Sequence, residues 1–278
     1  ALFRGWTIQE LHELTMIDEW FLAKLLHLCQ LEKRMTSETL TPALLTELKE
    51  CGFPDKTIFR ISGQSEFTRL PYSYKMVDTC GAEFEAETPY FYSTYGEEDE
   101  AKEFLAHMEN RKPVVMVFGS GPIRIGQGIE FDYASVHCVW ALKEAGYEVV
   151  IVNNNPETVS TDFNTADRLY FEPLTPEDIQ DIIDIEQPVG AVVAFGGQTA
   201  IRLTKWLSEK QIPILGTPAD SIDAAEDRGR FEELLKSLHI KQPQGTTVHT
   251  TEEALCAAEK LGYPVLLRPS YVLGGQNM

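Results

Sequence analysis

The sequence predicts an α/β protein with an N-terminal all-α domain. Apolar residues recur every three or four positions through the first part of the chain, which is typical of amphipathic helices. From residue 113 short apolar runs alternate with helical patterns, which is typical of a parallel, doubly wound sheet. Polar turns rich in glycine or asparagine follow two of these runs, as expected at the edge where such sheets bind ligands.

Helix signals dominate the N-terminal region. The apolar pattern predicts one long helix over residues 7–34, and Thr7 with Glu10 forms a capping-box sequence at its start. Two shorter helices are expected next, because an N-cap residue, a proline at a first helical position and two terminal glycines follow in order. The residues that mark these two helices are Thr41, Pro42, Gly52, Asp55 and Gly63.

The helical pattern stops in residues 70–95, which contain five of the ten tyrosines of the chain. We expect an extended segment there that packs across another surface. The acidic run at residues 97–100 predicts a solvated linker. The sequence therefore predicts a first domain over residues 1–95, a linker over 96–112 and a new domain from 113.

The region over residues 113–225 has the pattern of alternating strands and helices. Its short apolar runs have the length of buried parallel strands, and a glycine ends the first helical pattern. The expected strands are 114–118, 149–153, 191–195 and 212–215, and the expected helices are 131–145, 176–186 and 199–209.

The glycine-rich turn after the first strand has two interpretations. Gly119, Gly121 and Gly126 suggest a dinucleotide-binding turn, but Arg124 stands where the third glycine belongs. Residues 153–155 are asparagines where that fold needs an acid, and no Gly-Lys-Ser/Thr is present for a P-loop. Glycines that serve only a tight turn remain the open alternative.

A third pattern, over residues 226–278, ends in a strand-like run and paired glycines. Arg268 followed by Gly274 and Gly275 suits a lid over a nucleotide phosphate, because arginine supplies charge and glycine exposes backbone N–H groups. The equally open alternative is that Arg228 and Arg268 pair with surface acids. The expected elements are a helix over 225–238, a strand near 246–249 and a helix over 251–261.

Composition excludes several classes of protein. The acids outnumber the bases 43 to 24, for a net charge of −19, so we expect no nucleic-acid partner. No apolar run approaches the roughly 18 residues of a membrane span, and no secretory signal is present, so we expect a cytoplasmic protein. The five scattered cysteines suggest neither disulfides nor a zinc site. The start without methionine suggests an excised piece.

Several motifs together closely resemble the large chain of carbamoyl phosphate synthetase, over nearly the whole sequence. Within that family, residues 1–95 resemble the helical oligomerisation domain, 113–225 the pre-ATP-grasp domain of the second synthetase half, and 226–278 the truncated start of its ATP-grasp domain. The motifs that carry the resemblance lie at residues 124–133, 155–162, 167–173, 196–199 and 268–275.

The resemblance implies an ATP-dependent carbon–nitrogen ligase. Such an enzyme makes carbamoyl phosphate from bicarbonate, glutamine-derived ammonia and two ATP, with Mg²⁺ or Mn²⁺, and this half would phosphorylate carbamate. The implied partners are a small glutaminase subunit, which would contact mainly the first half, and further copies of the chain through residues 1–95. The sequence leaves arginine and pyrimidine biosynthesis both open as the pathway served.

The resemblance also assigns roles to single residues, but no complete catalytic set. The Mg²⁺-binding carboxylates of the family lie beyond Met278, so we expect this chain alone to be inactive. A non-catalytic oligomerisation or scaffold module is the competing interpretation. By motif position, Arg228 and Arg268 would contact ATP, Gly274 and Gly275 would close over its phosphates, and Gly128, Glu130 and Glu157 would border an internal passage for carbamate.

Overall fold

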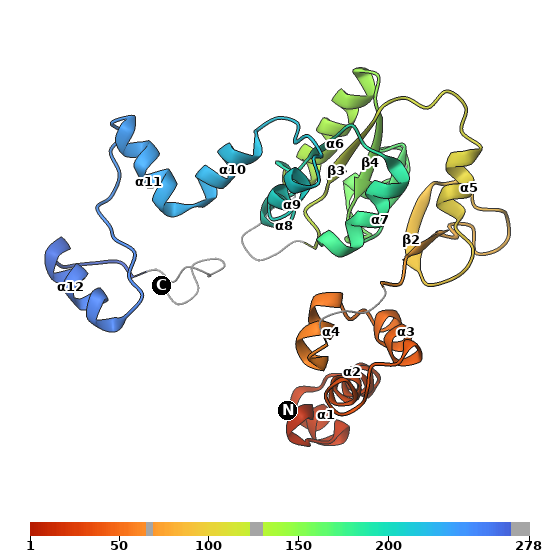
Figure 1. Ribbon diagram of the computed structural model, residues 1–278, viewed down its shortest axis with the longest axis horizontal. Helices are drawn as coiled ribbons and strands as arrows, with labels where there is room; N and C mark the ends of the chain where they lie inside the picture. Colours follow the sequence, from red (N-terminus) through yellow and green to blue (C-terminus); the bar gives the residue numbers. More distant parts are fainter. Residues whose placement is uncertain (65–68, 123–129, 268–278) are drawn as a thin grey trace. The chain divides into compact units, whose positions relative to one another are not determined.

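A computed structural model describes most of the chain. It covers residues 1–64, 69–122 and 130–267, without the side chains of Phe131 and Arg228. Figure 1 shows that the N-terminal part is helical and that the strands come later in the chain. The chain divides into two compact units, Ala1–Glu109 with Thr175–Ile185, and Asn110–Leu174 with Glu186–Met278.

The predicted long N-terminal helix is in fact two helices, α1 (Ile8–Thr15) and α2 (Glu19–Ser37). Met16 takes a left-handed conformation with φ 58° and ends α1. Asp18 then accepts a hydrogen bond of 2.8 Å from Trp20 N and starts α2 as its N-cap. The apolar spacing continues through the break, so periodicity alone could not reveal it, whereas the aspartate is the usual signal of a helix start.

The other helix signals of this region are confirmed. Thr7 Oγ1 accepts from Glu10 N at 3.2 Å and Glu10 Oε2 accepts from Thr7 N at 2.8 Å, which completes the capping box. Thr41 caps α3 (Pro42–Glu50), and α4 (Asp55–Ser62) follows. The helices bury one apolar cluster, made of Leu31, Met35, Leu44, Leu45, Leu48, Phe53 and Ile58.

Two strands and a helix lie where the sequence indicated only extended chain and linker. Strands β1 (Ser73–Met76) and β2 (Tyr90–Thr94) pair antiparallel, and α5 (Glu100–Ala106) packs on β1. The Phe91 ring contacts the edge of Phe104, with centroids 5.9 Å apart, and both Tyr74 and Phe91 are fully buried. Strands this short show no clear period, and the acidic residues before α5 suggested solvent exposure.

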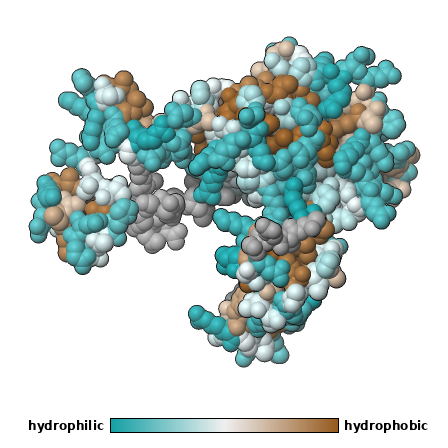
Figure 2. All heavy atoms as spheres, viewed as in Figure 1, coloured by the Kyte–Doolittle hydropathy of each residue, from teal (hydrophilic) through white to brown (hydrophobic). Residues whose placement is uncertain are grey.

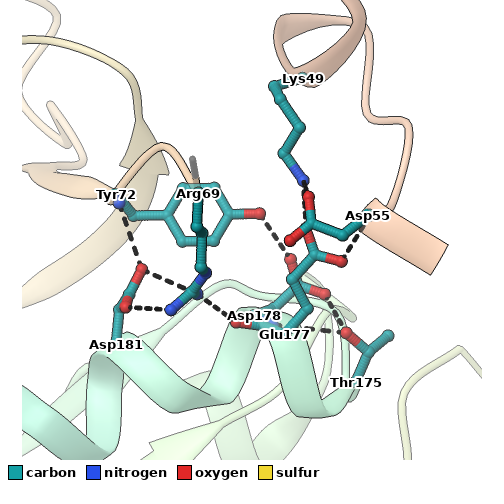
Figure 3. A network of polar contacts seen from close by, with 8 residues as sticks. All are labelled: Lys49, Asp55, Arg69, Tyr72, Thr175, Glu177, Asp178 and Asp181. Carbon is teal, nitrogen blue, oxygen red and sulfur yellow. Dashed lines mark hydrogen bonds and ion pairs between the residues drawn. The ribbon is translucent and has the colours of Figure 1, made fainter. Parts of the chain in front are cut away.

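Buried charges join the start of α7 (Pro176–Glu186) to the helical region, within one unit (Figure 3). Lys49 is 5% exposed; its ammonium pairs with Asp55 at 2.7 Å and with Glu177. Burial lowers the pKa of Lys49, but the hydrogen bonds to Asp55 and Glu177 outweigh it, so the pKa is raised. Glu177 also accepts from Asp55 N at 2.8 Å.

A second group of contacts, from Arg69 and Tyr72, reaches the first two turns of α7. Arg69 binds both carboxylate oxygens of Asp181, at 2.9 and 3.1 Å, and donates to the Glu177 carbonyl at 2.8 Å. The Tyr72 hydroxyl donates to Asp178 at 3.0 Å, and its burial raises the pKa of that phenol (Figure 3). These two-point contacts fix the rotation of α7 against the helical region.

The predicted parallel sheet is confirmed. Strands β3 (Val114–Phe118), β4 (Glu148–Val152), β5 (Arg168–Tyr170) and β6 (Gly190–Val192) are parallel, and they lie in the order β5-β4-β3-β6. Helix α6 (Glu130–Glu144) connects β3 to β4 and lies against both (Figure 1). The order reverses at β3, as in doubly wound sheets, where ligands generally bind beside the strand end at which the order reverses.

Strand β5 is absent from the prediction because it begins with a charged residue. Arg168 is 1% exposed and binds Glu186 through Nε and Nη2, both at 2.9 Å. Its Nη1 lies 3.0 Å from Glu148, and the Tyr170 hydroxyl donates to Glu186 at 2.8 Å. The strand prediction depended on a run of apolar residues, which Arg168 interrupts. Its burial is possible because Glu186 and Glu148 neutralise the guanidinium charge.

The remainder of the chain is mainly helical in its described part. Residues 212–215, predicted as a strand, form only a single bridge from Ile214 to Ala191, and no strand forms at 246–249. None of the described helices is long and apolar enough to cross a membrane. The other elements are the 3₁₀ turns η1 (Leu2–Arg4) and η2 (Val159–Thr161), and the helices α8 (Gly197–Ile201), α9 (Thr204–Glu209), α10 (Ala219–Glu226), α11 (Arg228–Ser237) and α12 (Thr251–Leu261).

Candidate functional site

Two glycine turns meet at the carboxyl edge of the parallel sheet, where its strand order reverses. One turn follows β3 at Gly119, and the other follows β6 at Gly196. A Cβ placed on Gly196 would lie 2.6 Å from the carbonyl oxygen of Gly119 and would overlap Ala200. The two turns are therefore in backbone contact, which only glycine allows.

The glycine turn also packs against the asparagines that follow β4. A Cβ on Gly119 would lie 2.5 Å from the side chain of Asn153, and Gly121 has φ +69°. Gly119 N donates to Val152 O at 2.9 Å, so the turn continues the sheet hydrogen bonding before it leaves the strand. Each described glycine of this turn thus has a steric reason to be glycine, as the tight-turn interpretation requires.

Replacing Gly196 with alanine should destabilise this edge. The added methyl group meets two backbone carbonyls that cannot move without breaking the sheet, so we expect the free energy of unfolding to fall by about 1–3 kcal/mol. Urea denaturation measures the change. Gly245→Ala is the control, because nothing lies within 4 Å of the methyl group there. Equal stability of the two variants would contradict the close contact.

Behind the turns lies a buried polar network. Asp132 of α6 is 2% exposed and accepts a hydrogen bond of 2.9 Å from Ser160 N and another from the Ser160 hydroxyl. Asn153, fully buried, donates to that hydroxyl at 3.3 Å and accepts from Gly121 N at 3.1 Å. The sequence predicted polar ligand-binding turns here, but it did not single out Asp132, because only the fold brings α6 onto the turn.

The residues assigned from the sequence fall into two groups. Glu130 is the first residue of α6 and Glu157 lies in the turn after β4, and both side chains are exposed. Glu157 N donates to Asn155 Oδ1 at 3.2 Å. For Arg228 the structure describes only the backbone, at the start of α11. The other assigned residues lie outside the described part of the chain: Gly128, Arg268, Gly274 and Gly275.

The described residues hold no cluster of three or more His, Cys, Asp or Glu side chains able to bind a metal ion. Arg230, near the start of α11, is paired at 2.9 Å with Asp220 and also with Asp223. The alternative of surface pairing for Arg228 and Arg268 stays a prediction, because the structure does not describe those two side chains. What the described edge offers a ligand is backbone turns and two exposed carboxylates.

Three protein-family models match the chain in succession. Residues 1–71 match the carbamoyl-phosphate synthetase large chain, oligomerisation domain. Residues 111–224 match the carbamoyl phosphate synthase preATP-grasp domain. Residues 227–278 match the carbamoyl-phosphate synthase L chain, ATP binding domain.

Whole-chain comparison gives the same family. The chain is 54% identical to the carbamoyl phosphate synthase large chains of Lachnoclostridium phytofermentans and of Agathobacter rectalis; each match covers 100% of this chain and 26% of the relative. Among solved structures, Rhizobium etli pyruvate carboxylase is 15% identical over 60% of this chain and 15% of that chain, with a TM-score of 0.45, too low to support an inference. The chain spans about a quarter of the length of its curated relatives, and it belongs to the carbamoyl phosphate synthase large-chain family.

Proposed function

We propose that the chain is part of the large subunit of a glutamine-dependent carbamoyl phosphate synthetase. The whole enzyme would make carbamoyl phosphate from bicarbonate, ammonia from a small glutaminase subunit and two ATP. The observation that carries the proposal is the 54% identity along the entire chain to large chains of that name. The succession of oligomerisation, pre-ATP-grasp and ATP-binding family models supports it.

Within that enzyme, this part would belong to the half that phosphorylates carbamate. Phosphoryl transfer depends mainly on positioning and on neutralising the charge of the phosphates, for which Mg²⁺ supplies most of the positive charge when bound. We propose that Arg228 and Arg268 contact ATP and that Gly274 and Gly275 close over its phosphates. The glycine turns at the sheet edge support a ligand site at the pre-ATP-grasp domain.

The chain on its own would not turn over ATP. By the family resemblance, the carboxylates that bind Mg²⁺ are not among residues 227–278, the segment that matches the ATP-binding domain. Phosphoryl transfer without a metal to neutralise the phosphates loses its main source of catalysis. We therefore propose that this chain is a structural part of the second synthetase half and that only the longer protein catalyses the reaction.

ATP formation from ADP and carbamoyl phosphate tests the proposed activity of the longer protein and the proposed inactivity of this chain. The longer protein that contains this sequence should form ATP when both compounds and Mg²⁺ are supplied, whereas the 278-residue chain should form none. A luciferase assay of ATP gives the readout, with reactions lacking carbamoyl phosphate as the control. No ATP from the longer protein would contradict the proposed activity, and ATP from the chain alone would contradict its proposed inactivity.

A second candidate function, self-association, is favoured by exposed apolar side chains on the first two helices and on the turn between them. Apolar atoms reach the surface of the N-terminal helical region (Figure 2). Contiguous exposed apolar residues of this kind mark protein–protein contact surfaces. We call them the α1–α2 surface: Leu14 (67% exposed), Met16 (76%), Ile17 (43%), Trp20 (61%), Phe21 (57%) and Leu25 (48%).

If the α1–α2 surface joins copies of the chain, one charge placed in it should prevent association. We expect the mass of the wild-type chain in light scattering to rise with concentration, and that of Phe21→Glu to stay at the monomer value, because burying a carboxylate is costly. Leu255→Glu changes an equally exposed leucine, 58% exposed, on α12 and should behave as wild type. A monomeric wild type at all concentrations would contradict this role.

A further inference from the structure

The polar network behind the two turns has one consistent set of hydrogen bonds. The hydroxyl of Ser160 has a single proton, and the buried carboxylate of Asp132 can only accept, so the proton goes to Asp132. The hydroxyl lone pairs are then left for the side-chain N–H of Asn153, 3.3 Å away. This orientation turns the carbonyl oxygen of Asn153 toward the backbone N–H groups of Gly121 and Asn155, at 3.1 and 3.2 Å.

The network therefore ties three separate segments to one carboxylate. It starts on α6 at Asp132, crosses the turn after β4 at Ser160 and Asn153, and ends on the turn after β3 at Gly121. The three side chains that form it are at most 2% exposed. Water competes little with hydrogen bonds at that depth, so loss of one acceptor leaves buried donors unsatisfied and shifts the turns.

Both exposed carboxylates of the predicted passage are attached to this network. Glu130 stands two residues before Asp132 at the start of α6. Glu157 lies in the turn held by Ser160, and its backbone N–H donates to Asn155, which itself donates to Asn153. Movement of the network would therefore displace the backbone that carries both glutamates.

We propose that Asp132 is a positioning residue for the passage of carbamate: through Ser160 and Asn153 it holds the start of α6, which carries Glu130, against the turn after β4, which carries Glu157. The proposal rests on the proposed function. Both oxygens of Asp132 accept a hydrogen bond from Ser160 and the residue is 2% exposed, so we assign it an indirect effect on the reaction. When the turns are displaced, carbamate escapes to water, where it decomposes, while the first half continues to consume ATP.

The test is the number of ATP molecules consumed per carbamoyl phosphate formed by the longer protein. Wild type should use two. Asp132→Asn replaces one acceptor oxygen with a donor that faces Ser160, and Ser160→Ala removes the hydroxyl that links the two ends of the network. We expect both variants to raise the ratio by about twofold or more, because small displacements of a bound group have large kinetic effects.

The ratio of ATP consumed to carbamoyl phosphate formed distinguishes a displaced passage from a smaller amount of folded enzyme. Unfolded molecules neither consume ATP nor make product, so they leave the ratio unchanged. ATP formation from ADP and carbamoyl phosphate needs no passage, so it should stay within about twofold of wild type per folded molecule in both variants. Thr204→Val is the matched control: this buried hydroxyl, 5% exposed, makes no hydrogen bond in the structure, and its loss should leave the ratio at two.

The outcomes distinguish failure of the positioning role from failure of the proposed function. A wild-type ratio in both network variants, with wild-type carbamoyl phosphate synthesis, would overturn the positioning role and leave the proposed function intact. A longer wild-type protein that makes no carbamoyl phosphate would refute the proposed function and, with it, this inference. If Asp132→Asn does not fold, Ser160→Ala decides the matter, because it keeps the carboxylate and its bond to the Ser160 backbone.

Discussion

Replacing Arg168 with methionine should lower the free energy of unfolding by about 3–5 kcal/mol. Methionine keeps the apolar stem but removes the cation between Glu186 and Glu148, whose side chains are 0% and 11% exposed; Arg111, 3.2 Å from Glu186, remains. Burial lowers the pKa of Arg168, but the charge and hydrogen bond of Glu186 outweigh it and raise the pKa, so the group stays charged throughout the accessible pH range. Urea denaturation at neutral pH measures the loss.

Arg230→Met is the matched control for this prediction. Arg230 also pairs with two carboxylates, Asp220 and Asp223, but its side chain is 42% exposed. Water replaces the lost partner at such a site, so we expect a change of at most about 1 kcal/mol. The comparison tests burial, since both residues are arginines that form ion pairs with two carboxylates. Similar losses in both variants would contradict the view that burial makes the Arg168 cluster costly to break.

Lys49→Met should be the next most destabilising change, by about 2–4 kcal/mol. The variant leaves Asp55 and Glu177 without their shared cation; because their side chains are 20% and 17% exposed, water compensates for part of the loss. Lys102→Met is the control, because Lys102 pairs with Asp99 at 2.8 Å but is 62% exposed, and it should change the stability by less than about 1 kcal/mol. Thermal or urea unfolding of the variants gives the comparison.

The stabilisation by Lys49 should also depend on pH in a definite direction. Its pKa is higher in the folded than in the unfolded chain, so its contribution is complete below the unfolded value of about 10.4 and declines as the pH rises through the folded value. The difference in stability between wild type and Lys49→Met should therefore be smaller at about pH 11 than at about pH 8. A difference that grows with pH would contradict this sign.

The sequence predicted best those elements whose local signals agree with their environment. Strand β3 matches its prediction at both ends because it is apolar throughout, and α3, α7 and α12 match because caps, prolines or glycines mark their limits. It predicted worst where local signals conflict with tertiary contacts. β5 carries Arg168 into the sheet, and α5 has acidic residues around an apolar face.

In the candidate site, too, the features with a local sequence signal were predicted and those that depend on tertiary contacts were not. The two polar turns were visible because runs of glycine and asparagine directly after apolar strands are typical of turns at the ligand edge of a parallel sheet. Asp132 could not be recognised as their common anchor, since its partner Ser160 lies 28 residues along the chain. Long-range pairing of this kind has no local signal.

By itself, the sequence determined the order of helical and α/β regions, most strands of the parallel sheet, the turns at its ligand edge and the family resemblance. All of these depend on residues close together in the chain or on whole motifs. Only the tertiary structure decided which buried charges are neutralised and which carboxylate holds the turns. The physical reason is that the stability of a buried polar group depends on partners that the fold, and not the neighbouring sequence, brings within hydrogen-bonding distance.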